Sequence, residues 1–180
     1  RAKSLIATVV LLLASSSYAQ VSPTPIIHYP FNAVDDIQDG TLQGDAYIVW
    51  DEERQSYCLN PEGFASYLQP GSGFNIQSPP ITVAAWIKTD SLTNLDTVAS
   101  FGYRWRLYAE ADLGMAFEIG NTTQPSRVIG SRVVNDGVWH HVVGTFDGSR
   151  SRIYVDGELD ASVTASGTVG TGPSGYTAAI

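Results

Sequence analysis

Apolar and polar side chains alternate along short stretches of this chain, most clearly over residues 81–88. One face of that stretch carries only apolar residues: Ile81, Val83, Ala85 and Ile87. Trp86 lies on the opposite face with polar neighbours. A repeat of two is the period of a β-strand with one buried face. Similar runs predict further strands at Tyr47–Trp50, Ala65–Leu68, Thr97–Phe101, Trp105–Ala109, Met115–Ile119, Arg127–Val134, Trp139–Phe146, Arg152–Val155 and Glu158–Val163.

Asp-Gly pairs separate the strand candidates in the second half of the chain, at positions 136–137, 147–148 and 156–157. Gly accepts positive φ and Asp tolerates it, so these pairs suit tight turns. Beyond the first twenty residues, no long stretch shows the 3.6-residue apolar period of a helix. Short strands at this spacing predict an all-β sandwich or barrel of antiparallel strands.

The first 19 residues have the order of a secretory signal peptide. Two basic residues, Arg1 and Lys3, precede the apolar run Leu5–Ala14, and small residues lead to Ala19. The apolar run has about ten residues, whereas a helix needs roughly 20 to span a bilayer. We therefore predict cleavage after Ala19 rather than a membrane anchor or a buried helix.

These boundaries divide the chain into three parts. Residues 1–19 are the predicted signal peptide, residues 20–25 a flexible lead, and residues 26–180 a single folded domain. We expect the mature protein to be secreted or held at the cell surface, without membrane insertion after signal cleavage.

Composition and charge narrow the range of partners. Hydrophobic residues make up 43% of the chain, which is enough for a packed core. The formal net charge is −8, with 10 basic residues against 18 acidic ones. Because a phosphate backbone requires clustered cations, we do not expect nucleic acid as a partner.

Cys58 is the only cysteine, so no disulfide forms within this sequence. In an exported protein such a residue is either buried or paired with a cysteine outside the sequence. Burial is favoured because its neighbours, Tyr57 and Leu59, are typical of a strand interior.

One motif resembles a known family. Residues 136–148 read DGVWHHVVGTFDG and residues 153–157 read IYVDG, which resembles the LamG-like jelly-roll domains of the concanavalin A-like lectin/glucanase superfamily. Tyr29–Asn32 and Ile81–Lys88 are similar to two earlier strands of that family. The resemblance covers about residues 27 to 165 and implies a jelly-roll sandwich of two antiparallel sheets. The family's closing strand is not found before Ile180, so we expect the domain to be incomplete at its carboxyl end.

Glucanases of this superfamily make catalysis a hypothesis to test. The resemblance implies a strand with the pattern Glu-x-Asp-x-x-Glu, which brings two carboxylates into one groove. The nearest match is Glu110 and Asp112, with Met115 in place of the second Glu and Gly114 interrupting the strand pattern. We therefore expect the domain not to be an enzyme.

Adjacent histidines, His140 and His141, are considered as metal ligands. Successive side chains of a strand point to opposite faces, so neighbouring histidines do not easily hold one ion. We expect both to contribute to folding instead.

Candidate ligand-binding residues are Arg104, Trp105 and Arg106. An exposed aromatic ring flanked by arginines can stack on a sugar ring and hydrogen-bond its hydroxyls. The alternative is that Trp105 belongs to the core and the arginines lie at the edge of the sheet. Asn121–Thr123 is a glycosylation sequon.

Some LamG-like relatives hold calcium near their opening motif. The resemblance therefore suggests a calcium site at Asn32, Asp36 and Asp39, although Asn32 stands where the family often has Asp. Calcium takes oxygen ligands, which acidic loops supply.

Together, these features predict a secreted, non-catalytic binding module within a longer extracellular protein. The expected ligand is a carbohydrate or a protein partner. A structural or adhesive spacer domain is the alternative, and a glycoside hydrolase is a third hypothesis.

Overall fold

The computed structural model of the chain describes residues 6–12, 27–71, 79–92, 96–102, 104–111, 113–120, 127–167, 169 and 178–180. Within these ranges the regular secondary structure is all β-strand, and no helix is present. The all-β prediction is therefore confirmed.

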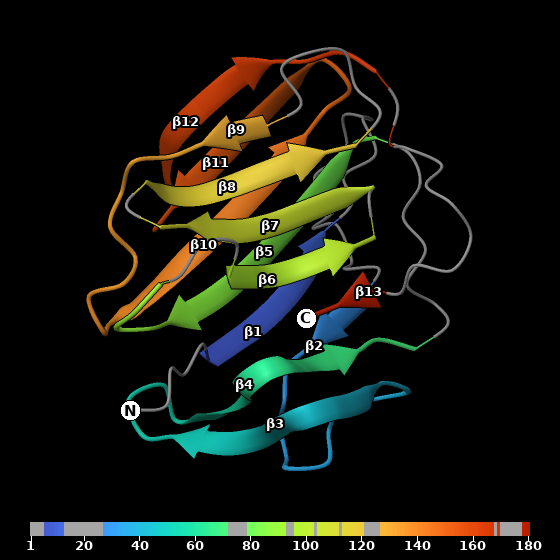
Figure 1. Cartoon of the computed structure of the whole chain (residues 1–180), viewed down its shortest axis with the longest axis vertical. Coiled ribbons are helices and arrows are strands. Elements are labelled where there is room, and N and C mark those ends of the chain that lie inside the picture. The colour runs from blue at the N-terminus through green and yellow to red at the C-terminus, as the bar shows by residue number, and fades with distance from the viewer. Residues whose placement is uncertain are drawn as a thin grey trace, which may run out of the picture.

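The strands form two antiparallel sheets that pack face to face (Figure 1). The larger, eight-stranded sheet contains β1 (Ile6–Leu12), β2 (Ile27–Tyr29), β3 (Thr41–Asp51), β4 (Ser56–Gln69), β5 (Ile81–Lys88), β10 (Trp139–Phe146), β11 (Arg150–Val155) and β12 (Glu158–Thr164). Its order is β12-β11-β10-β5-β1-β4-β3, and β2 pairs with β1.

The smaller, five-stranded sheet lies in front of the larger one in Figure 1. It contains β6 (Asp96–Phe101), β7 (Trp105–Glu110), β8 (Gly114–Ile119), β9 (Arg127–Ile129) and β13 (Ala178–Ala179). The order of its strands is β13-β6-β7-β8-β9. Because the two sheets pack face to face, one face of this sheet covers the core and the other points away from the sandwich.

The core lies between the two sheets, as the period of two predicts. The predicted inner face of β5 is buried, and Trp86 on its other face is only partly buried. The inner faces of β7, β8 and β10 contribute further fully buried side chains: Trp105, Leu107, Phe117, Val142 and Phe146. Removing these apolar surfaces from water is the main driving force for the sandwich.

The Asp156-Gly157 pair forms the tight turn that the sequence predicts. It joins β11 to β12, and the φ angles are 52° at Asp156 and 81° at Gly157. Positive φ at both central residues is typical of the type I′ hairpin turn, which matches the twist of the flanking strands.

One predicted strand, Arg127–Val134, is shorter in the structure. β9 ends at Ile129, and the next backbone N–H groups, of Ser131 and Arg132, donate to the carboxylate of Asp160 at 3.0 and 3.2 Å. Because a side chain on β12 satisfies these donors, the backbone leaves the sheet. The period of apolar residues in this stretch carries no information on that tertiary contact.

The amino-terminal apolar run contains strand β1 in this structure. β1 pairs with β5 from Ile6 opposite Lys88 to Leu12 opposite Thr82. Cleavage after Ala19 would remove β1 and leave this edge of β5 without that neighbour. The signal peptide remains a prediction. Among the described residues, no helix has the length and apolar character needed to cross a membrane.

Candidate functional site

Trp105 is a core residue. Its side chain is 1% exposed on the inner face of β7, so its ring is not available to stack on a sugar. The alternative left open by the sequence is therefore the correct one for this residue. Arg104 precedes β7, and its guanidinium lies 4.8 Å from the centre of the Phe101 ring.

Arg106 points to the outer face of the five-stranded sheet, where it begins a row of charged residues. It lies directly opposite Glu118 on β8, which in turn lies opposite Arg127 on β9. The guanidinium of Arg106 donates to the Glu118 carboxylate at 3.0 Å. Opposite charges in cross-strand positions stabilise a sheet modestly and hold the side chains in defined places.

Tyr108 and Glu110 lie beside this row on β7. Arg127 Nη1 donates to the Tyr108 hydroxyl at 3.2 Å and approaches the Glu110 carboxylate at 3.4 Å. Arg106 lies over the Tyr108 ring, 4.0 Å from its centre. Burial raises the pKa of Tyr108 and outweighs the lowering by Arg127, so its hydroxyl stays protonated at neutral pH.

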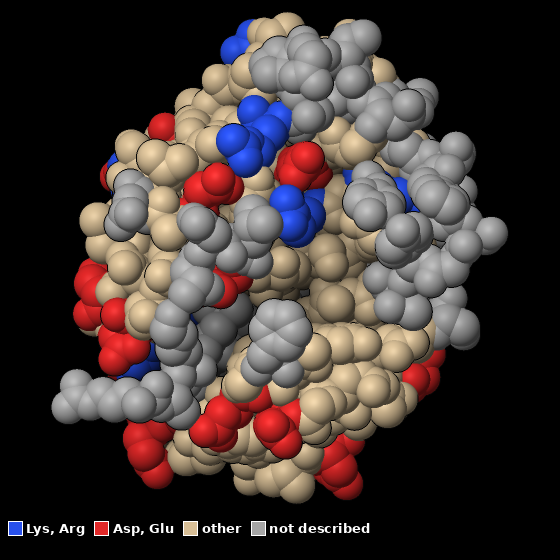
Figure 2. Space-filling model, viewed as in Figure 1, with Lys and Arg blue, Asp and Glu red and all other residues tan. Residues whose placement is uncertain are grey.

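We call these five residues the outer-face cluster: Arg106, Tyr108, Glu110, Glu118 and Arg127. The side chains of Arg127 and Glu118 are 43% and 38% exposed, so solvent reaches both a donor and an acceptor. Figure 2 shows basic and acidic side chains next to one another on the face above the five-stranded sheet. Such a surface offers the hydrogen-bond donors and acceptors that hydroxyl-rich ligands require.

The sequence identified only Arg106 of this cluster as a ligand residue. Glu110 is the nearest match to a catalytic carboxylate, and the sequence assigns no ligand role to Tyr108, Glu118 or Arg127. Alternation along β7 places Arg106, Tyr108 and Glu110 on one face. The register of β8 and β9 against β7 adds the other two, and that register is a property of the folded sheet.

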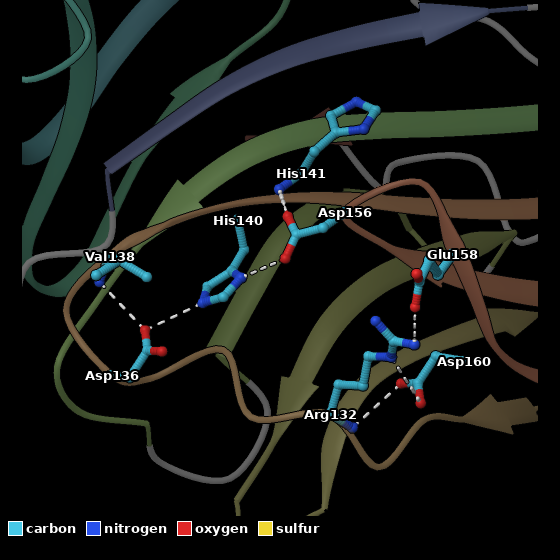
Figure 3. Close-up of polar contacts among 8 residues, drawn as sticks. All are labelled: Arg132, Asp136, Val138, His140, His141, Asp156, Glu158 and Asp160. Carbon is cyan, nitrogen blue, oxygen red and sulfur yellow. Dashed lines mark hydrogen bonds and ion pairs between the residues drawn. The ribbon is translucent and has the colours of Figure 1, made fainter.

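A second polar cluster surrounds His140 at the start of β10 (Figure 3). Nδ1 of His140 lies 2.8 Å from an Asp156 carboxylate oxygen, and Nε2 lies 3.0 Å from Asp136. The other oxygen of Asp156 accepts the His141 backbone N–H at 2.8 Å. His140 thus connects the loop before β10 to the β11–β12 turn. These contacts hold two segments of the fold together.

The two histidines have opposite electrostatic surroundings. Burial lowers the pKa of His140, but the hydrogen bonds with Asp156 and Asp136 outweigh it, and the pKa is raised overall. Burial dominates at His141 and lowers its pKa. The His141 ring packs against Trp86, with 5.0 Å between ring centres. Their separate environments fit the expectation that both serve folding.

Cys58 is buried in β4, in agreement with the sequence-based preference. Burial raises the pKa of its thiol to about 11. The thiolate is the reactive form, so burial keeps this cysteine in its less reactive thiol form at neutral pH.

Two of the three proposed calcium ligands, Asn32 and Asp36, contact each other, and the third, Asp39, has a different neighbour. The Asp36 carboxylate accepts the Asn32 backbone N–H at 2.8 Å, and Asp39 lies against Gly71. In the part of the chain that the structure describes, no three His, Cys, Asp or Glu side chains are close enough to hold a metal ion. Calcium binding therefore remains a prediction.

Asp112 and the sequon at 121–123 lie outside the described residues.

This architecture, two antiparallel sheets closed around one core, defines a jelly-roll sandwich. A family model for the concanavalin A-like lectin/glucanases superfamily matches residues 62–179. The chain belongs to this superfamily, as the motif at residues 136–148 indicated.

A similar solved structure is domain 4 of AbnA, an extracellular GH43 arabinanase from Geobacillus stearothermophilus, in complex with arabinotriose. The identity is 19% and the TM-score 0.58, over 78% of this chain and 72% of that chain. This likeness supports the fold. A comparison with curated protein sequences gave no match.

Proposed function

We propose that the chain is a secreted, non-catalytic glycan-binding module of a longer extracellular protein. The outer-face cluster carries this proposal, because it presents paired arginines and carboxylates on a rigid sheet. A glycan hydroxyl donates to a carboxylate and accepts from a guanidinium. Neighbouring residues of opposite charge, such as Arg106 and Glu118, can therefore hydrogen-bond adjacent hydroxyls of one sugar. A site held by strands needs little ordering when its ligand binds.

Binding without catalysis is favoured by the way the carboxylates are engaged. Glycoside hydrolysis requires a pair of carboxyl groups on either side of the scissile bond. In the outer-face cluster each carboxylate holds an arginine instead: Glu118 with Arg106 at 3.0 Å and Glu110 with Arg127 at 3.4 Å. This arrangement suits the recognition of hydroxyl groups.

Calorimetric titration with soluble oligosaccharides tests the proposal. The panel includes arabinotriose, xylohexaose and cellohexaose. Arg106→Ala and Arg127→Ala should each weaken binding about 10- to 100-fold, the range for a lost hydrogen bond to a charged group. Arg150→Ala is the matched control, because Arg150 is exposed on β11 of the other sheet.

Two outcomes would redirect the interpretation. Unchanged affinity in both cluster variants, with normal melting curves, would exclude the outer face as the site. Failure of the wild-type chain to bind any glycan would favour the spacer hypothesis. Incubation of the same oligosaccharides with the protein should yield no shorter products, and turnover that disappears in Glu110→Gln would contradict the non-catalytic role.

A further inference from the structure

Of the four tryptophans in the chain, only Trp50, at the end of β3, is exposed. It follows Ile48 on the same face of the strand, and Ile48 packs partly against the core. Two residues further on, Trp50 is 41% exposed, whereas Trp105 is 1% exposed. Burying an aromatic ring is strongly favourable, so an indole left open to solvent on a rigid strand is a candidate contact surface.

Tyr57 supports the Trp50 ring from the neighbouring strand. The two residues lie directly opposite one another in the β3–β4 register. Their ring centres are 5.2 Å apart at an interplanar angle of 73°, an edge-to-face contact. This geometry is favoured by the charge distribution of aromatic rings and fixes the orientation of the indole.

The turn that follows Trp50 carries polar side chains of both charges. The β3–β4 turn contains Glu52, Glu53 and Gln55, all exposed, and Gln55 Nε2 donates to the Glu52 carbonyl at 2.7 Å. It also contains Arg54, whose guanidinium lies 4.2 Å from the centre of the Trp86 ring. The Nζ atom of Lys88 on β5 forms an ion pair with the Glu53 carboxylate at 2.6 Å. An apolar ring with a polar rim fits a single sugar ring, whose CH face stacks while its hydroxyls reach the rim. A protein interface requires a larger continuous surface.

We propose that Trp50, supported by Tyr57, is a stacking platform for a neutral glycan made of pyranose rings. Asp51, Glu52 and Glu53 outnumber the two nearby cations, Arg54 and Lys88, and this net negative charge disfavours an anionic sugar. The platform rests on the proposed glycan-binding function and adds a contact on β3 that is separate from the outer-face cluster.

Tyr47 provides a matched control on the same strand. It is 40% exposed, close to the value for Trp50, and three residues earlier it points to the opposite face of β3. Its hydroxyl accepts a hydrogen bond from Asn60 at 2.8 Å. Tyr47→Ala therefore removes an equally exposed ring and perturbs the same hairpin without touching the platform.

The test is calorimetric titration of wild type, Trp50→Ala, Trp50→Phe and Tyr47→Ala with cellohexaose and xylohexaose. Trp50→Ala should weaken binding about tenfold, Trp50→Phe about threefold, and Tyr47→Ala less than twofold. In the wild type, saturating oligosaccharide should protect part of the tryptophan fluorescence from acrylamide quenching, and Trp50→Phe should abolish that protection.

Binding that is unchanged in Trp50→Ala would overturn the platform and leave the outer-face proposal intact. Equal losses in Trp50→Ala and Tyr47→Ala would also overturn it, since general damage to the hairpin then explains both. If Trp50→Ala does not fold, Trp50→Phe and the quenching experiment decide, and unprotected fluorescence at saturation contradicts the platform. A wild-type chain that binds no glycan overturns the platform together with the proposed function.

Discussion

His140 shows how a single residue joins parts of the chain that are distant in sequence. With carboxylates at both ring nitrogens, the protonated imidazolium donates two hydrogen bonds, whereas the neutral ring donates only one. The side chain is 12% exposed, so solvent screens these contacts only partly. Asp136 precedes β10 and Asp156 follows β11, so the charge of His140 helps to hold both segments against β10.

The contribution of His140 to stability should depend on pH. Its pKa is raised above the usual 6.5 in the folded protein, so the stabilisation is fully present below pH 6.5 and is lost as the pH rises through the folded pKa. The gap in melting temperature between wild type and His140→Gln should narrow with increasing pH above 6.5. Melting curves between pH 5 and 9 measure this effect.

His141 is the control, because its contribution has the opposite sign. Its pKa is lowered by burial, so protonation below pH 6.5 disfavours the folded state. His141→Gln should therefore reduce the loss of stability on acidification. A pH-independent gap between wild type and His140→Gln would show that the charge of His140 does not stabilise the fold.

At the scale of elements, the two sheets pack against each other where β10 of the larger sheet contacts β8 of the smaller one. Gly144 lies on β10 between bulky residues, and a Cβ atom built there would lie 2.5 Å from Cδ2 of Phe117 on β8. Such a separation is far below van der Waals contact. Gly144 thus allows the aromatic ring of one sheet to approach the backbone of the other.

Gly144→Ala should destabilise the protein by about 1–3 kcal/mol, the usual cost of overpacking a core. Chemical denaturation measures the change in the free energy of unfolding. Phe117→Leu in the same chain should recover part of the loss, since a smaller side chain makes room for the methyl group. Strictly additive effects of the two substitutions would mean that the residues do not contact each other in solution.

At the scale of the whole molecule, β1 raises the question of which residues complete the larger sheet. β1 lies between β5 and β4, and it pairs with β5 along its full length. The same residues lie in the predicted signal peptide. A mature chain that begins after Ala19 would have to fold without β1.

We predict that the mature protein begins at Gln20. Amino-terminal sequencing and intact mass of secreted material measure this directly. The physical reason is the order of basic, apolar and small residues over positions 1–19, which signal peptidases recognise. A secreted chain that retains Ile6–Leu12 would contradict cleavage and would support β1 as a permanent strand.

The amino-acid sequence by itself determined the class of fold and most of its strands. Ile81–Lys88 and Trp139–Phe146 have the predicted bounds, because alternation and turn residues such as Gly157 are local constraints that survive folding. The motif at residues 136–148 likewise indicates the superfamily from local sequence alone.

Only the tertiary structure decided which side chains are exposed and which of them meet. Trp50 and Trp105 are the same residue type in similar strands, yet one is exposed and the other is buried, because burial depends on what the opposite sheet covers. The pairing of Arg106 with Glu118 depends on strand register in the same way. Periodicity specifies the face on which a side chain lies, and the neighbours it meets there are set by how strands and sheets pack.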